Sequence, residues 1–342
     1  MKKAIVLFNL GGPDKLENVE PFLFNLFNDP AIINLPGIIR YPLAKFISNR
    51  RAPIAKKIYE QLGGSSPILK LTNDQSSKLE QKLNQKNHLD EYKCFVVMRC
   101  WHPRANEVVN KVKLYNPDEV ILLPMYPQFS ASTSASSIKE WKDICEVNNY
   151  NIKTNTICCY PTEFDFIKAH VLEINKKINK INNFKLIFSA HGLPEKNIKK
   201  GDPYQWQVEQ TTFEIVKHLN IDNLDWILSY QSRVGPLKWI GPSTDEVIIK
   251  NSKLGKSLVV VPVAFVSEHS ETLVELDIEY KKLAFDNGCV KYIRVPALGT
   301  NDTFIESLSD SIINYEKNYF NGKIFPPKKK CPSNFVKCPC QS

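Results

Sequence analysis

Two largely apolar segments of the chain lead directly into side chains that can bind a metal ion or take up protons. Segment 185–190 is followed by His191, and segment 258–266 is followed by a polar stretch that contains His269 and Glu271. Apolar runs that stop abruptly at polar residues are typical of buried parallel strands. Because ligands of open α/β folds bind at the carboxyl ends of strands, these side chains are candidates for one site.

Four glutamates lie in and beyond the second of these stretches. They are Glu268, Glu271, Glu275 and Glu279, at spacings of three, four and four. If the segment from about Ser270 is helical, this spacing puts the four carboxylates on one face. Aligned carboxylates repel one another unless they hold a cation, and a hydrated divalent metal fits best. The alternatives are a structural histidine and an ordinary acidic surface of a helix.

The composition is that of an ordinary soluble globular chain. It has 342 residues, which suits two domains, with 43% hydrophobic and 24% charged residues. No stretch of apolar residues is long enough to span a bilayer, and the short apolar start is better read as a strand than as a signal sequence. The net charge of +9 is too diffuse to suggest nucleic acid, but it favours an anionic membrane surface or carboxylate ligands.

The nine cysteines do not form the framework of a disulfide-rich secreted protein. Four are scattered along the chain and are expected to be reduced, namely Cys94, Cys100, Cys145 and Cys289. The other five fall into two groups, Cys158 with Cys159 and, in the tail, Cys331, Cys338 and Cys340. The three thiols of the tail can form a four-thiolate centre only if a fourth thiol comes from elsewhere in the chain. An iron–sulfur cluster, a zinc site and thiols that bind no metal are all possible at this point.

Three pairs of segments echo each other in the two halves of the chain, in the same order. They are 4–13 with 185–194, 94–103 with 226–236, and 119–133 with 257–272. Between them lie helical patterns at Ser77–Gln85, Ala105–Leu114, Phe166–Lys177 and Tyr204–His218. Alternating strands and helices predict an α/β fold of two similar flavodoxin-like or Rossmann-like halves, whose parallel sheets face a central cleft.

The predicted domains are an N-terminal half at 1–150, a C-terminal half at 151–320 that carries the metal site, and a cysteine-containing tail at 321–342. The first half includes an insertion at about 15–90, whose front part has more large apolar residues than a loop needs. These residues could line a flat apolar pocket or rest on a membrane. The neighbouring cations, which could receive carboxylates or lipid phosphates, are Arg40, Lys45, Arg50 and Arg51.

Several motifs together resemble the ferrochelatase family over nearly all of residues 3–320. They include LGGP at 10–13, RRAP at 50–53, YPQFS at 126–130, FSAHGLP at 188–194, QSRVGP at 231–236 and SEHSETLVELDIEY at 267–280. That family inserts ferrous iron into a porphyrin to make haem. The resemblance implies the chelatase fold, a lyase activity, Fe(II) and protoporphyrin IX as substrates, and no nucleotide cofactor.

The resemblance also assigns site residues. It implies His191 and Glu271 as the metal-site pair, with Glu275 and Glu279 continuing the line of acids outward. Positions that match porphyrin contacts are Arg51, Tyr59 and Ser66, and positions that match the pocket lining are Ile33, Arg99, Cys100, Trp239 and Phe265. Whether His191 accepts protons or ligates the metal stays open.

Some members of that family carry a [2Fe–2S] cluster on a C-terminal cysteine group and one distant cysteine. The tail resembles the bacterial form of this arrangement, with Cys331, Cys338, Cys340 and, as the first choice for the fourth ligand, Cys158 rather than Cys159. We further expect a cytoplasmic protein attached peripherally to the inner face of the membrane. The alternative functions are another tetrapyrrole chelatase, acting on coproporphyrin or sirohydrochlorin or loading cobalt, and a non-catalytic porphyrin- or metal-binding protein.

Overall fold

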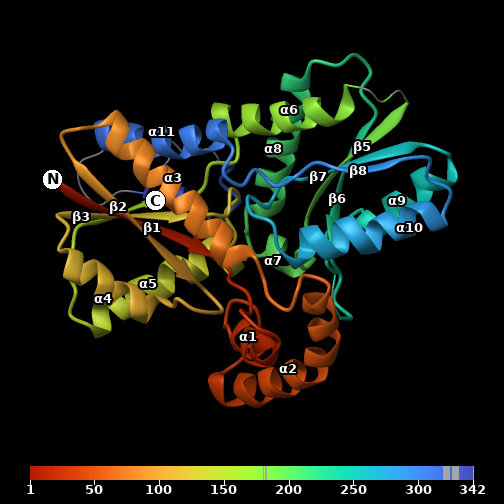
Figure 1. The fold of residues 1–342 in the computed structure, drawn as a ribbon. Helices are drawn as coiled ribbons and strands as arrows, with labels where there is room; N and C mark the ends of the chain where they lie inside the picture. Colours follow the sequence, from red (N-terminus) through yellow and green to blue (C-terminus); the bar gives the residue numbers. More distant parts are fainter. Residues whose placement is uncertain (180, 182, 234, 319–323, 326–330, 342) are drawn as a thin grey trace. The chain divides into compact units, whose positions relative to one another are not determined.

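A computed structural model describes all residues of the chain except 180, 182, 234, 319–323, 326–330 and 342 (Figure 1). It divides into two compact units, each built around its own parallel sheet. The first unit contains Met1–Tyr126, Ser130–Cys158 and the segment from Ser309 to the strand β9. The second contains Pro127–Phe129, Cys159–Leu308 and the described residues from Cys331 on.

The first sheet has the strand order β2-β1-β3-β4-β9, with parallel pairing throughout. Its strands are β1 Lys2–Asn9, β2 Glu91–Met98, β3 Glu119–Pro124, β4 Thr154–Ile157 and β9 Ile324–Phe325. β1 is an interior strand between β2 and β3, and its residues from Ala4 to Phe8 are buried on both faces of the sheet. This burial explains why the segment is a continuous apolar run rather than an alternating one.

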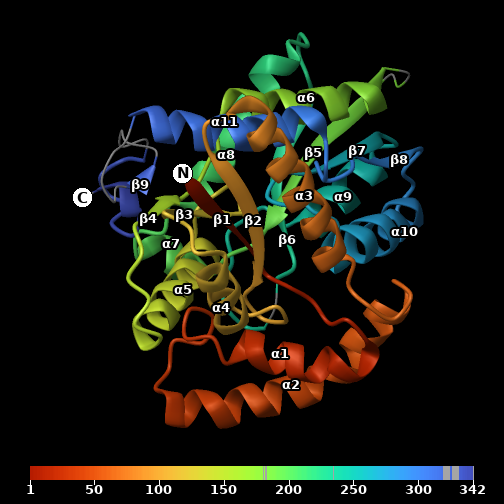
Figure 2. The same ribbon diagram turned by 60° about the vertical axis from the view of Figure 1, so that its left-hand side comes forward.

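Helices cover both faces of the first sheet (Figures 1 and 2). They are α3 Ile68–Lys86, α4 Ala105–Tyr115 and α5 Ser136–Val147. On one face, Val108 and Val109 of α4 and Trp141 of α5 pack against the strands. α3 lies against β2 on the other side of the sheet. The apolar stripes of these helices therefore form the core together with the strands.

The front of the first unit is a separate helical layer, α1 Val19–Phe27 and α2 Gly37–Glu60. Phe22 and Leu23 of α1 pack with Tyr59 of α2 and with Cys100 in a small core of their own. Many other apolar residues of this layer stay exposed, so only part of its apolar surface serves the core. Among the described residues, no helix is both long and apolar enough to cross a bilayer.

The second sheet has the strand order β6-β5-β7-β8, again with parallel pairing. Its strands are β5 Phe184–His191, β6 Trp226–Gln231, β7 Ser257–Pro262 and β8 Tyr292–Arg294. The helices of this unit are α6 Phe164–Ile178, α7 Glu195–Lys199, α8 Tyr204–Leu219, α9 Thr244–Lys253 and α10 Tyr280–Asp286. α11, Asp302–Asn318, begins in this unit and continues in the first. Ile248 of α9 and Ala284 of α10 pack on one face of the sheet, and α6 lies beside α8 near β7.

The predicted internal duplication is visible in the topology. The orders β2-β1-β3-β4 and β6-β5-β7-β8 are the same permutation of consecutive strands. The backbone N–H of Met98 at the end of β2 donates to the carbonyl of Pro103, and Tyr230 of β6 donates in the same way to Pro242. Short π-helices, Ala131–Ala135 and Glu271–Glu279, follow β3 and β7. The prediction of two similar parallel-sheet halves is confirmed.

The four predicted helical segments are also confirmed, as parts of α3, α4, α6 and α8. The observed helices start earlier than predicted in α3 and α6, by nine and two residues. For α3 the reason is that Ile68 and Thr72 are buried against the rest of the unit, which stabilises the first turns of a helix that the local pattern alone does not indicate.

Candidate metal-binding site

His191 is the last residue of β5, at the carboxyl edge of the second sheet. Its Nδ1–H donates to the Gly192 carbonyl at 2.6 Å, because a carbonyl oxygen can only accept. This leaves Nε2 facing Glu271, 3.6 Å from Oε1 of that carboxylate. The Tyr204 hydroxyl donates to the carbonyl oxygen of His191 at 3.0 Å. The imidazole is therefore held by its backbone and by Nδ1, with Nε2 left for chemistry.

Glu271 lies between two histidines. Its second oxygen, Oε2, is 3.6 Å from Nε2 of His269, whose own Nδ1 faces the Ser267 carbonyl at 3.2 Å. His269 is buried, and its ring stands 4.7 Å from the ring of Phe265. The strand-end pattern predicted His269 and Glu271 as candidates for one site, whereas the family resemblance gave His269 no role. The structure places His269 directly beside Glu271.

The electrostatic environment keeps Glu271 ionised. Burial alone would raise its pKa, but the neighbouring His191 and His269 outweigh burial and lower the pKa to about 2. A negative charge at this position favours an arriving cation and a protonated imidazole.

Glu275, one step farther along the π-helix, is held by the end of β6. Gln231 donates to Oε2 at 2.9 Å, the Ser232 backbone N–H donates to Oε1 at 2.9 Å, and the Tyr280 hydroxyl donates to Oε1 at 3.0 Å. Burial and the charge of Glu271 raise the pKa of Glu275, although these hydrogen bonds oppose the shift. The pKa values of these two neighbouring acids are thus shifted in opposite directions, so Glu271 is ionised and Glu275 binds a proton more readily.

The structure changes the expected line of four acids. The helix does continue through Glu271, Glu275 and Glu279, but as a π-helix, and Glu268 lies before it. Glu268 is instead paired with Arg294 at 2.6 Å and accepts the Ala297 backbone N–H at 3.0 Å. The expectation that Glu268 shares the acidic face is therefore wrong, because the carboxylate of Glu268 pairs with the guanidinium of Arg294 on β8. Glu279, the last residue of the π-helix, is exposed.

Trp239 and Phe265, two predicted pocket residues, lie beside these histidines in the second unit. Trp239 is bridged to Pro194, and a Cβ atom on Gly192 would be 3.1 Å from its indole ring. Gly192 therefore permits the close approach of Trp239 to the residue after His191. Phe265 contacts His269 directly. One aromatic ring thus contacts the His269 imidazole, and another lies against the residue that follows His191.

The other predicted porphyrin residues lie in the first unit. Tyr59 and Cys100 are buried in the small core of the front layer, and Arg51 stands over the Phe27 ring at 5.9 Å. The Ser66 hydroxyl accepts the Ile68 backbone N–H at 3.4 Å. Ile33 donates its backbone N–H to the Asp29 carbonyl, in the turn after α1.

Each of the three guanidinium nitrogens of Arg99 already has a partner within the first unit. Its guanidinium pairs with Asp29 at 2.8 Å and with Glu140 at 3.1 Å, and its Nε donates to Ser136 at 2.8 Å. Arg99 therefore ties the turn that bears Ile33 to α5.

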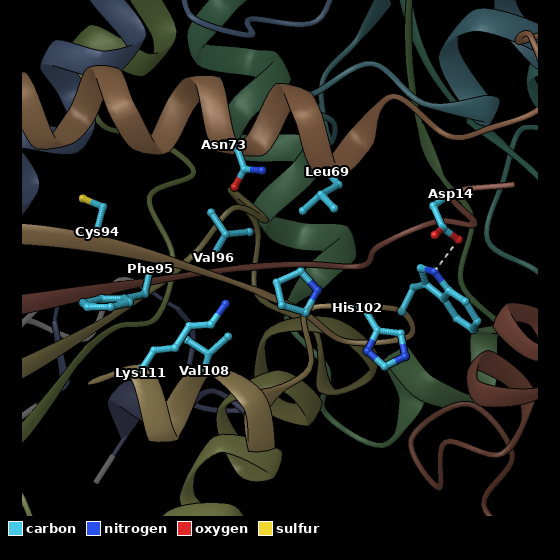
Figure 3. A pocket seen from close by; sticks show the side chains of 11 residues that line it. Asp14, Leu69, Asn73, Cys94, Phe95, Val96, His102, Val108 and Lys111 are labelled. Carbon is cyan, nitrogen blue, oxygen red and sulfur yellow. Dashed lines mark hydrogen bonds between the residues drawn. The ribbon is translucent and has the colours of Figure 1, made fainter. Parts of the chain in front are cut away.

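A pocket of about 460 Å³ opens between α3, α4 and the edge strand β2 (Figure 3). Asn73, Val96 and Lys111 line it, and the Trp101 indole N–H donates to Asp14 at 2.9 Å at one end. None of the predicted metal or porphyrin residues lines this pocket. The candidate site is therefore identified by the distances among His191, Glu271 and His269 at the strand ends of the second sheet, and not by the volume of this pocket.

The tail thiols approach one another in the second unit. The Cys338 thiol is hydrogen-bonded to Cys331, and this contact together with burial raises the pKa of Cys331. Gln207 of α8 donates to Cys331 at 3.2 Å and to Cys159 at 3.5 Å. Cys340 lies two residues after Cys338, in a short 3-10 helix. Cys158 is buried at the end of the first unit. No three His, Cys, Asp or Glu side chains of the described chain form a site for a single metal ion.

Comparison with known proteins gives a consistent result. The ferrochelatase family profile matches residues 2–316. A protein named ferrochelatase from Pelagibacter ubique is 71% identical over 340 residues, which are 99% of both chains. Another of that name, from Rickettsia felis, is 49% identical over 346 residues, covering 100% of this chain and 99% of the relative.

Solved structures show the same fold. SirB from Bacillus subtilis with Fe3+ superimposes with a TM-score of 0.56 at 10% identity, covering 94% of this chain and all of that one. The sirohydrochlorin chelatase SirB in complex with cobalt, from the subspecies spizizenii, has a TM-score of 0.52 at 11% identity, with the same coverage. These structural similarities confirm the predicted chelatase fold. With the profile and the close relatives, they establish that the chain belongs to the ferrochelatase family of metal-chelating lyases, which insert iron into a porphyrin.

Proposed function

We propose that the chain inserts Fe(II) into protoporphyrin IX at the His191–Glu271 pair, forming protohaem in the last step of haem biosynthesis. The observation that carries this assignment is the free Nε2 of His191, 3.6 Å from the carboxylate of Glu271 at the carboxyl edge of the second sheet. An imidazole and an ionised acid at one point can handle both protons and a divalent cation.

The chemistry of the substrate explains the pair. A porphyrin must lose two pyrrole N–H protons as the metal enters, and the metal must shed its water in steps. Nε2 of His191 can take such a proton or hold the metal, since Nδ1 is already committed to Gly192. Glu271 stabilises either positive charge, because it stays ionised well below neutral pH. The apolar rings of Trp239 and Phe265 suit a flat macrocycle beside this point.

Glu275 extends the proposed path outward. Its raised pKa and its bonds to Gln231, Ser232 and Tyr280 suit a group that passes protons or cations between Glu271 and the exposed Glu279. The three acids therefore lead from the half-buried, ionised Glu271 through Glu275 to the exposed Glu279.

Replacing His191 tests the proton- or metal-handling role. We expect His191→Ala to abolish insertion of Zn(II) or Fe(II) into protoporphyrin, by about 10²-fold or more, while porphyrin binding persists. The absorption spectrum of the porphyrin follows both steps. His218→Ala, which removes a histidine from the end of α8, is the matched control. A folded His191 variant with most of its turnover would rule out the assignment.

Two substitutions test the direction of the acidic path. Glu271→Gln should reduce kcat strongly, because it removes the charge beside His191. Glu279→Gln should mainly raise the metal concentration needed for half-maximal rate, because this carboxylate is exposed and lies at the outer end of the π-helix. Steady-state rates over a range of Zn(II) concentrations separate the two effects. Equal losses at both positions would argue against a path.

We further propose that the protein is cytoplasmic and attaches peripherally to the inner face of the membrane through its front layer. Ile38, Phe46 and Ile54 of α2 are 87%, 62% and 66% exposed. Arg50, also exposed, adds positive charge to the same helix. Apolar side chains flanked by cations favour an anionic lipid surface, and substrate and product are poorly soluble in water.

Vesicle binding tests this attachment. The chain should sediment with vesicles of mixed neutral and anionic phospholipid at low salt. Ile38→Glu with Phe46→Glu should weaken binding at least about tenfold, since each removes apolar area that membrane binding would bury. Leu89→Glu alters an equally exposed leucine outside the front layer and should have no effect. Failure of the unaltered chain to bind such vesicles would refute the proposal.

The tail thiols support a [2Fe–2S] cluster as a resident group. The residues that would hold it are Cys331, Cys338, Cys340 and one thiol of the Cys158–Cys159 pair. Cys159 has the more direct support for that fourth place, because Gln207 contacts both Cys159 and Cys331. Iron bound by four thiolates supplies a one-electron redox centre.

Colour and iron content test the cluster. Protein purified without oxygen from iron-replete cells should be reddish, with about two irons per chain for a [2Fe–2S] centre. Cys338→Ser should bleach it, and Cys289→Ser, at a buried cysteine on the far side of the second sheet, should not. Comparing Cys158→Ser with Cys159→Ser identifies the fourth ligand. A colourless, iron-free wild type would eliminate the cluster.

A further inference from the structure

Gln207 of α8 is a fully buried amide whose hydrogen bonds are all accounted for. Its side-chain oxygen accepts the Phe129 backbone N–H at 2.7 Å. Its Nε2 group donates to the sulfur of Cys331 at 3.2 Å and to that of Cys159 at 3.5 Å. The residue has no exposed surface, so water cannot replace any of these partners.

The orientation of the amide follows from chemistry. A backbone N–H can only donate, so the atom that faces Phe129 must be the carbonyl oxygen of Gln207. The NH₂ group is then forced to point at the two sulfurs. A flipped amide would leave an N–H against an N–H and an oxygen against two thiols.

A neutral thiol is a weak acceptor, whereas a thiolate accepts hydrogen bonds strongly. A buried NH₂ group aimed at two neutral thiols would thus be poorly satisfied, at a free-energy cost of about 1–3 kcal/mol. The same group is well satisfied once the two sulfurs are metal-bound thiolates. The placement of Gln207 therefore suits two metal-bound sulfurs better than two free thiols.

We propose that Gln207 is a hydrogen-bond donor to the thiolate ligands of the iron–sulfur centre and raises its reduction potential. This inference rests on the cluster proposed above. Hydrogen bonds to ligand sulfurs stabilise the more negative, reduced state, and outer-shell partners of metal ligands also contribute to metal retention. Because one amide contacts both Cys331 in the tail and Cys159, two residues after β4, it also links the two ligand-bearing segments.

The test measures the reduction potential of the anaerobically purified full chain by dithionite titration, followed by its visible absorption. Gln207→Leu removes both donors and the acceptor. Gln207→Glu keeps an oxygen for the Phe129 N–H but cannot donate to sulfur when ionised, so it separates the sulfur contacts from the fold. Gln205→Leu, two residues earlier on α8 where the amide bonds to Glu209, is the matched control. Zinc insertion into protoporphyrin and the melting temperature report that each variant is folded.

We expect both Gln207 variants to be harder to reduce, with the ratio of reduced to oxidised centre at a given potential falling about tenfold, or about 59 mV for one electron. Gln205→Leu should match the wild type. Loss of colour in both folded Gln207 variants would also support the assignment, because it requires Gln207 to act at the centre. A coloured wild type with unchanged potentials in both variants would overturn the role of Gln207 alone. A colourless wild type would overturn the cluster itself, and the inference with it.

Discussion

The candidate site depends on keeping one half-buried carboxylate, that of Glu271, ionised. Removing Glu271 from water disfavours its charge, and only the two imidazoles that flank it reverse this effect. His191 comes from the end of β5, and His269 and Glu271 come from the segment after β7. The register that pairs Ser189 with Pro262 therefore decides whether the three groups meet. Any slip between these two central strands would leave the half-buried carboxylate without compensation.

Three adjacent strands supply the site, because parallel strands end at the same edge. β5 supplies His191, β7 leads into the π-helix, and β6 ends at Gln231, which binds Glu275. The π-helix is consistent with this function, since such turns are rare and are frequent at functional sites. Its acids differ in environment rather than in chemistry. Glu271 faces histidines, whereas Glu275 faces neutral donors and a neighbouring negative charge. This contrast lowers the pKa of Glu271 and raises that of Glu275.

Helix α8 serves both chemical centres of the second unit. Near its start, Tyr204 fixes the backbone of His191, and one turn later Gln207 contacts the thiols of Cys159 and Cys331. The spacing of three residues puts both side chains on one side of the helix. The tail also binds back to this region, because the Lys337 backbone N–H donates to the Gly201 carbonyl just before α8. A single rigid element thus positions residues of the proposed insertion site and of the proposed cluster.

The sequence by itself determined the two parallel-sheet halves, their duplicated order and the four helices, because buried strands and amphipathic helices leave periodic patterns in the chain. Its motifs also determined the family. Only the tertiary structure decided which side chains pair with one another. Arg294 forms an ion pair with Glu268, and Arg99 forms ion pairs with Asp29 and Glu140. His269 lies beside Glu271. These pairings join residues from different strands and loops, so they depend on register and three-dimensional distance. Local spacing records neither quantity, which is why the sequence could place the acids but could not show that Glu268 pairs with Arg294 while Glu271 faces two histidines.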